Sequence, residues 1–89
     1  MKRVRVVVSG RVQGVFFRAT CASLAREAGV AGSVRNLPDG AVTAAFEGED
    51  EAVDRLVAWC RRGPDRAQVD RIEVLLEEPA GEATFRVIG

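Results

Sequence analysis

The spacing of apolar residues changes several times along the chain, and each change predicts a new secondary-structure element. Within residues 3–9, Val4, Val6 and Val8 recur at every second position. This alternation predicts a strand that turns these three side chains toward a core. Gly10, directly after the alternating run, is expected to end the strand.

Two later segments have helical spacing. The first begins at Phe17, and Gly29 suits its C-terminal cap. The second lies within residues 48–64, which open with acidic residues and close with two arginines, a glycine and a proline, the order that the helix dipole and capping chemistry favour. The predicted buried residues are Phe17, Cys21, Leu24, Ala25 and Ala28 in the first helix and Val53, Leu56, Val57 and Cys60 in the second.

The remaining apolar segments are extended. Residues 33–36 and 41–47 flank the turn sequence "LPDG" and predict a hairpin, and residues 67–78 and 83–89 predict two more strands. The element order is β-α-β-β-α-β with a short extra strand at the C-terminus. This order predicts an α+β, ferredoxin-like fold of the split βαβ type, with two helices on one face of a mostly antiparallel sheet. We expect residues 1–89 to form a single domain.

Composition narrows the class of protein. The chain is 47% hydrophobic and 29% charged, as in ordinary globular proteins. Thirteen basic and thirteen acidic residues are scattered along it, so no overall field attracts nucleic acid or an anionic membrane. The N-terminal apolar run is too short for a signal peptide or a membrane span. We therefore expect a cytoplasmic protein.

The chain has two cysteines and no histidine. Two cysteines are too few for the disulfide framework of a small secreted domain. Cys21 and Cys60 both fall in predicted helices, where we expect them to be reduced packing residues. Without histidine or a CxxC pair, no zinc site is expected.

The segment "SGRVQGVFFRAT", residues 9–20, leaves the first strand and enters the first helix. A glycine-containing loop in this position can point backbone N–H groups, reinforced by the helix dipole, into a concavity that suits a phosphate. Arg18 could add its planar donor fork. The Walker A and GxGxxG patterns are both absent. From spacing alone, Gly10 and Gly14 can equally serve a tight turn and Arg18 can be a solvated residue, so both interpretations stay open.

The chain contains "GRVQGVFFR" at residues 10–18 and "VRNLPDGAVTAAFEG" at residues 34–48. These two motifs resemble the acylphosphatase family, and the similarity covers nearly the whole chain. One departure is Ser33, which stands where the family usually has an aromatic residue. Since Ser33 and Asn36 alternate to opposite faces of a strand, we expect this departure to affect packing. The matched residues are Gly10, Val12, Gln13, Gly14, Val15, Phe17 and Arg18 in the first motif, and Gly32, Val34, Asn36, Gly40, Val42 and Gly48 in the second.

The resemblance implies hydrolysis of acyl phosphates, which are mixed anhydrides of a carboxylic acid and phosphoric acid, with neither metal nor cofactor. A carboxylate is a weakly basic leaving group, so the absence of a histidine acid fits this chemistry. Asn36 would orient the attacking water, although an asparagine before "LPDG" is also ordinary turn chemistry. The assigned residues are Arg18 and Asn36 as catalytic residues, and Gly14, Val15, Phe16 and Phe17 as the phosphate-binding loop.

Three rival interpretations remain. An RNA-binding module is disfavoured because the chain lacks an aromatic pair on adjacent central strands and has no net charge. A regulatory domain of the same fold would bind a small ligand without turnover. Acylphosphatase-like modules also occur inside larger carbamoyl-transfer proteins, which we disfavour because no partner domain follows Gly89. We expect a monomer that acts on a small acyl phosphate, with Phe16 and Phe17 as core or pocket walls and Arg11 and Arg35 as solvated charges.

Overall fold

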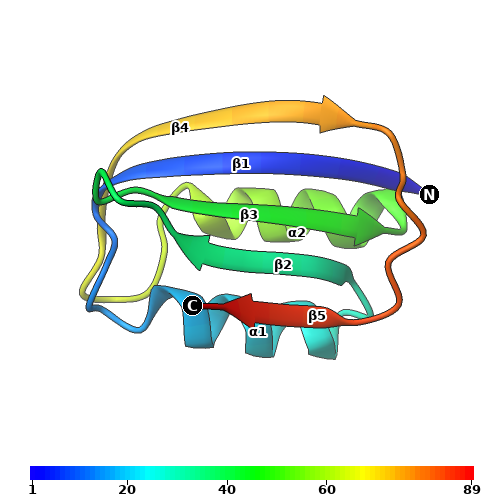
Figure 1. The fold of residues 1–89 in the computed structure, drawn as a ribbon, viewed down its shortest axis with the longest axis horizontal. Coiled ribbons are helices and arrows are strands. Elements are labelled where there is room, and N and C mark those ends of the chain that lie inside the picture. Colours follow the sequence, from blue (N-terminus) through cyan, green and yellow to red (C-terminus); the bar gives the residue numbers. More distant parts are fainter.

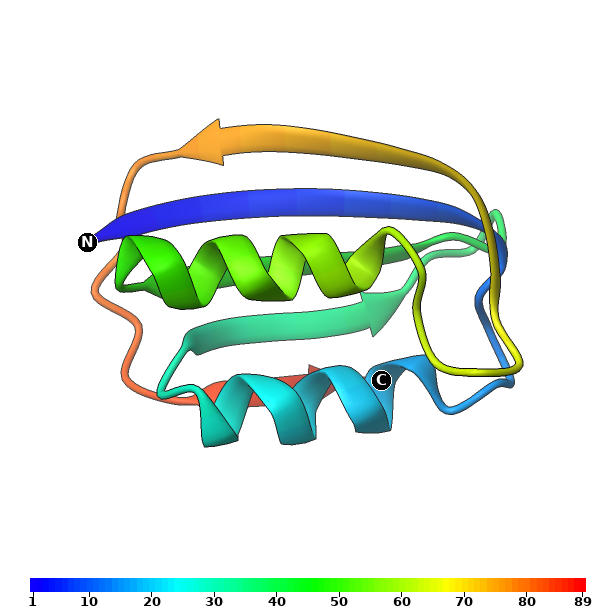
Figure 2. The same ribbon diagram turned by 180° about the vertical axis from the view of Figure 1, so that it is seen from behind.

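A computed structural model describes all of residues 1–89, which form a five-stranded sheet with two helices packed on one of its faces (Figure 1). The view from behind shows both helices in front of the sheet (Figure 2). In chain order the elements are β1 (Lys2–Arg11), α1 (Phe17–Glu27), β2 (Ala31–Asn36), β3 (Val42–Gly48), α2 (Asp50–Cys60), β4 (Gln68–Glu77) and β5 (Phe85–Ile88).

The strands lie in the order β4-β1-β3-β2-β5. Neighbouring strands are antiparallel except β2 and β5, which run parallel. The predicted order of elements and the mostly antiparallel sheet are therefore confirmed, and the short last strand forms the edge beside β2. This arrangement brings the start of α1 and the ends of β2 and β5 to the same end of the sheet (Figure 1).

The core lies between the sheet and the inner faces of both helices. Val4, Val6 and Val8 are buried there, as predicted. In α2 all four predicted residues are buried. In α1 the prediction is wrong at Ala28, which is exposed. Ala28 is the C-cap, where the chain leaves the helix, and Val30 beyond it returns to the core instead.

The prediction that Gly10 ends β1 is also wrong. The strand continues to Arg11, and its register with β4 shifts between Ser9 and Gly10, which marks a β-bulge. Gly10 has a φ of 125°, and a Cβ at this position would collide with the backbone carbonyl oxygen of Gln68. The glycine therefore allows two backbones to approach closely at the bulge, just before the loop that enters α1.

A buried ion network holds the opposite end of the sheet. Glu47 at the end of β3 is 2% exposed and accepts the backbone N–H groups of residues 80–82 at 2.8, 2.9 and 3.2 Å. Arg3 donates to Glu47 at 3.1 Å and to Glu77 at 2.9 Å. These bonds fasten the connection between β4 and β5 to the sheet.

Cys21 of α1 and Cys60 of α2 are both fully buried, and neither forms a disulfide. A hydrogen bond with the Cys21 thiol, together with burial, raises the pKa of Cys60 well above its ordinary value. Cys60 therefore stays protonated and packs as a small apolar residue. Neither helix is long and apolar enough to cross a membrane.

Candidate active site

The loop between β1 and α1 leaves a set of backbone donors without acceptors. The amides of residues 14–19 donate to no carbonyl or side chain in the structure, and the first helical hydrogen bond runs from the Thr20 N–H to the Phe16 carbonyl at 3.0 Å. Gly14 and Phe16 have φ angles of 73° and 63°. Such left-handed turns before a helix form a concave nest of N–H groups, which suits an anion.

The first turn of α1 adds to this preference for negative charge. Its N-cap is Phe16, which offers no side-chain cap, and the turn contains no acidic residue. The partial positive charge at the helix N-terminus is therefore not compensated by the protein. A bound phosphate would supply both the missing acceptors and the missing charge.

Arg18 projects from this first turn toward the end of β5. Its Nη1 donates to the carbonyl oxygens of Ile88 and Gly89 at 3.3 and 3.0 Å. These bonds fix one edge of the guanidinium group and leave its Nε and Nη2 donors without a protein partner. No Asp or Glu side chain lies within ion-pair distance of Arg18, so no acidic side chain of the protein neutralises its charge.

Asn36 is the last residue of β2. The register pairs it with Val42, so it lies on the helix-facing side of the sheet, as does the buried Val34. Its Oδ1 is the only buried side-chain nitrogen or oxygen atom in the structure without a hydrogen-bond partner. Because an unpaired buried oxygen is unfavourable and uncommon, this atom is a candidate acceptor for a water or ligand proton.

Gln13 connects the loop to the turn that follows Asn36. Its Nε2 donates to the carbonyl oxygens of Leu37 and Ala41 at 2.8 and 2.9 Å. The same turn is closed by the N–H of Leu37 on Ala41 at 2.8 Å, and Asp39 accepts the Ala41 N–H at 3.0 Å. Gln13 belongs to the first sequence motif, but its role could not be assigned from sequence, since this contact depends on two segments that meet only in the folded chain.

A concavity of about 470 Å³ joins the loop, Arg18 and Asn36. Of the predicted site residues, Val15 does not line it, because its side chain is buried in the core. Val87 and Gly89 of the C-terminal segment also line it, and the sequence contained no motif that would have identified them. Arg18 is the only charged side chain in the lining, which comprises Val12, Gly14, Phe16, Phe17, Arg18, Ala19, Asn36, Val87 and Gly89.

Other residues considered from sequence lie outside this concavity. Arg11 and Arg35 are exposed and form no ion pair. Ser33 pairs with Ala45 on the face away from the helices, so its side chain does not point toward Asn36. No group of three or more His, Cys, Asp or Glu side chains lies close enough together to hold a metal ion.

Comparison with known proteins supports the resemblance to the acylphosphatase family. The family model described as Acylphosphatase matches residues 4–87. The acylphosphatase of Roseiflexus sp. is 55% identical over 82 residues, which cover 92% of this chain and 88% of the relative. The crystal structure of the acylphosphatase from Bacillus subtilis superposes with a TM-score of 0.94 at 32% identity, covering 100% of both chains.

The same fold also occurs inside larger proteins. The structure of HypF from T. kodakarensis matches with a TM-score of 0.86 at 30% identity, and the match covers 100% of this chain but 12% of HypF. By contrast, the family model matches residues 4–87 of this chain, and the match to the Roseiflexus relative covers 88% of that protein. These findings confirm the resemblance seen in the two sequence motifs, and this chain belongs to the acylphosphatase family.

Proposed function

We propose that the chain hydrolyses acyl phosphates to a carboxylate and inorganic phosphate, as the names of its relatives indicate for those proteins. The observation that carries the proposal is a convergence in one concavity. Unpaired amides and free arginine donors meet there with a buried, unpartnered amide oxygen. A phosphoryl group and an attacking water would satisfy all three.

The phosphoryl group binds the loop. The free amides of residues 14–17 and the helix N-terminus donate to its oxygens, and Arg18 adds the Nε and Nη2 donors that the Ile88 and Gly89 carbonyls leave unused. Phosphoryl transfer passes through a loose transition state with charge spread over the equatorial oxygens. Fixed donors aimed at those oxygens therefore supply most of the catalysis.

Asn36 positions the water. Its Oδ1 accepts one water proton, which directs the water oxygen at phosphorus. As the new P–O bond forms, the bond between phosphorus and the acyl oxygen breaks, and the carboxylate leaves with the electron pair. An amide cannot take up a proton, so the water proton passes to a phosphoryl oxygen of the substrate.

The leaving group explains why this site contains no acid. A carboxyl group has a pKa of roughly 4 to 5, so the carboxylate leaves at neutral pH without protonation. Arg18 and the loop amides also neutralise the phosphoryl charge. The reaction therefore proceeds without a metal ion or cofactor.

We further propose that residues 1–89 act as one monomeric domain on a small-molecule substrate in the cytoplasm. Two features support this setting. The buried thiols of Cys21 and Cys60 form no disulfide, as suits a reducing compartment. All strands and both helices contribute to the same core.

Hydrolysis of a synthetic aryl acyl phosphate in the presence of a chelator tests the proposal. Wild type should turn over the substrate, and Arg18→Ala should lower kcat/KM by about 10²- to 10³-fold and abolish inhibition by inorganic phosphate. Arg35→Ala is the matched control, because Arg35 is exposed and lies outside the concavity. A folded wild type that binds phosphate without turnover would instead indicate a regulatory binding domain.

A further inference from the structure

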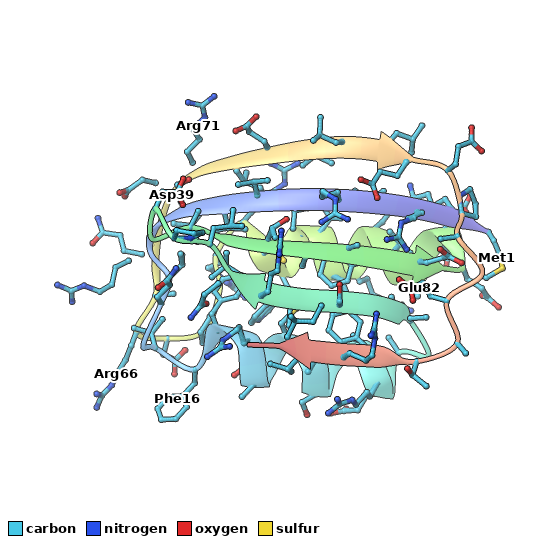
Figure 3. All side chains as sticks on the ribbon, viewed as in Figure 1. Met1, Phe16, Asp39, Arg66, Arg71 and Glu82 are labelled. Atoms are coloured by element: carbon cyan, nitrogen blue, oxygen red, sulfur yellow. The ribbon has the colours of Figure 1, made fainter.

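Phe16 is unusual in both its backbone and its side chain. It is the only residue other than glycine with a positive φ, at 63°. Its side chain is 75% exposed, whereas the neighbouring Phe17 is 2% exposed. Figure 3 shows the Phe16 ring directed away from the sheet and the helices, at the end of the molecule that also carries Asp39.

Neither property is explained by folding. The left-handed conformation is unfavourable for a bulky L residue, and glycine or asparagine would adopt it more readily. Exposure of a large aromatic ring to water adds no stability either. The phosphate cradle requires the positive φ and the amide of residue 16, but it does not require a ring. The aromatic side chain must therefore be explained by something else that binds at this end of the loop.

The mouth of the concavity extends the apolar surface beyond the ring. Val87 pairs with Val34 in the parallel register of β5, so it lies on the helix-facing side, and it is 44% exposed. Ala19 of the first helical turn is also exposed and lines the same concavity. Phe16, Ala19 and Val87, which we call the apolar rim, thus surround the arginine and the loop amides.

Both polar side chains of the concavity already have a role in phosphoryl transfer, because Arg18 binds the phosphoryl group and Asn36 positions the water. Arg18 is its only charged side chain and Asn36 its only other polar side chain. A charged or strongly polar acyl group would therefore find no partner of its own at the rim, and its desolvation would be uncompensated. An apolar acyl group would cover Phe16 and Val87 and exclude water from both.

We infer that the acyl group of the preferred substrate is apolar, with an aromatic ring favoured, and that it packs on Phe16 and Val87. This inference rests on the proposed function, because it assigns the part of the substrate that leaves the phosphate cradle. Phe16 thus has two separable roles: its amide faces the phosphate, and its ring selects the acyl group.

The test compares kcat/KM for benzoyl phosphate, acetyl phosphate and succinyl phosphate, whose carboxylates are of similar basicity. Wild type should prefer benzoyl phosphate to both others by roughly tenfold or more. Phe16→Ser should lower the ratio of benzoyl to acetyl phosphate by about 3- to 10-fold, and Phe16→Leu by less. Both variants keep a Cβ in the left-handed conformation. Any disturbance of the cradle lowers kcat/KM for both substrates alike, so its effect cancels in the ratio.

Val87→Thr is the second variant, because it keeps the shape of valine and replaces one methyl group by a hydroxyl. It should lower the same ratio by about 2- to 3-fold. An unchanged ratio in Phe16→Ser, or a wild-type preference for succinyl phosphate, would overturn the inference while leaving the proposed function intact. Absence of turnover with all three substrates would contradict the proposed function itself.

Discussion

The buried polar groups at the two ends of the sheet differ in whether they have hydrogen-bond partners. At one end, both oxygens of the buried Glu47 carboxylate are occupied, by Arg3 and by the backbone amides of residues 80–82. At the other end, the buried Oδ1 of Asn36 has no partner at all. Figure 3 labels Glu82 near the first end and Phe16 at the second.

The two helices repeat this difference. The N-terminus of α2 lies at the Glu47 end and carries Asp50 and Glu51 in its first turn, where they compensate the helix dipole. The N-terminus of α1 lies at the Asn36 end and has neither an acidic residue nor a side-chain cap. A fully satisfied network stabilises the fold, whereas unpaired donors and acceptors remain available to a ligand. We therefore expect substitutions at the Glu47 end to change stability and substitutions at the Asn36 end to change activity.

Asn36→Ala should produce the largest effect on activity. Loss of the oxygen that we propose to orient the water should lower kcat by about 10²- to 10³-fold. The free energy of unfolding should stay within about 0.5 kcal/mol of wild type or rise, because the variant removes an unpartnered buried atom. Steady-state kinetics and urea denaturation measure the two quantities. A large loss of stability would show instead that Asn36 stabilises the fold.

Glu47→Ala should have the converse effect. It leaves Arg3 and three backbone amides without their shared acceptor, so the thermal midpoint should fall by roughly 10 °C or more. The kcat of the folded variant should remain within about twofold of wild type. Glu78→Ala is the control, because Glu78 is exposed and directly follows Glu77 in the sequence. It should change neither quantity. Loss of activity without loss of stability would break the contrast between the two ends.

Acid should weaken the same network. The Ala80 amide, with Arg3 and the next two amides, holds the pKa of Glu47 below its ordinary value, and Arg5 with Arg3 does the same for Glu77. A lowered folded-state pKa stabilises the protein above the unfolded-state value of about 4.3, and this contribution is lost as the pH falls through the folded-state pKa. Urea midpoints should therefore fall below about pH 4, and less steeply for Glu47→Gln. If the urea midpoints of wild type and Glu47→Gln fall in parallel with decreasing pH, Glu47 is excluded as a source of the pH dependence.

Gln13→Ala should have a smaller effect, on both quantities. It removes the bonds to Leu37 and Ala41 that hold the turn after Asn36, while the turn keeps its own backbone bonds. We expect a loss of about 1 to 2 kcal/mol of stability and roughly a tenfold loss of kcat. Inhibition by inorganic phosphate should change little, because Arg18 and the loop amides remain. A weaker affinity for phosphate with normal kcat would place Gln13 in the cradle rather than behind Asn36.

Much of the fold was predictable because periodicity is a local property of the sequence. The alternation in β1 and the helical stripe of α2 both read directly as buried faces. The same alternation in β4 does not distinguish a core strand from an edge strand. Leu76 is 80% exposed there, although it pairs with the buried Val4 of β1, because β4 lies at the edge of the sheet.

The site was predictable only in part, for a related reason. Arg18 and Asn36 stand in motifs, so the resemblance assigned them roles before their positions were known. The contact of Gln13 with the turn and the position of Val87 at the rim depend on segments far apart in sequence. Glu47 has the sequence pattern of an outward-facing strand residue, and it is buried because the connection between β4 and β5 folds over it.

The central claim is that water attacks phosphorus while the loop and Arg18 hold the phosphoryl group. Hydrolysis of an acyl phosphate by the wild-type protein in water enriched in heavy oxygen tests it directly, because the label marks the atom attacked. We predict that mass spectrometry will find the heavy oxygen in inorganic phosphate and none above background in the carboxylate. Label in the carboxylate would mean attack at the acyl carbon, and would contradict the roles proposed for the cradle and for Asn36.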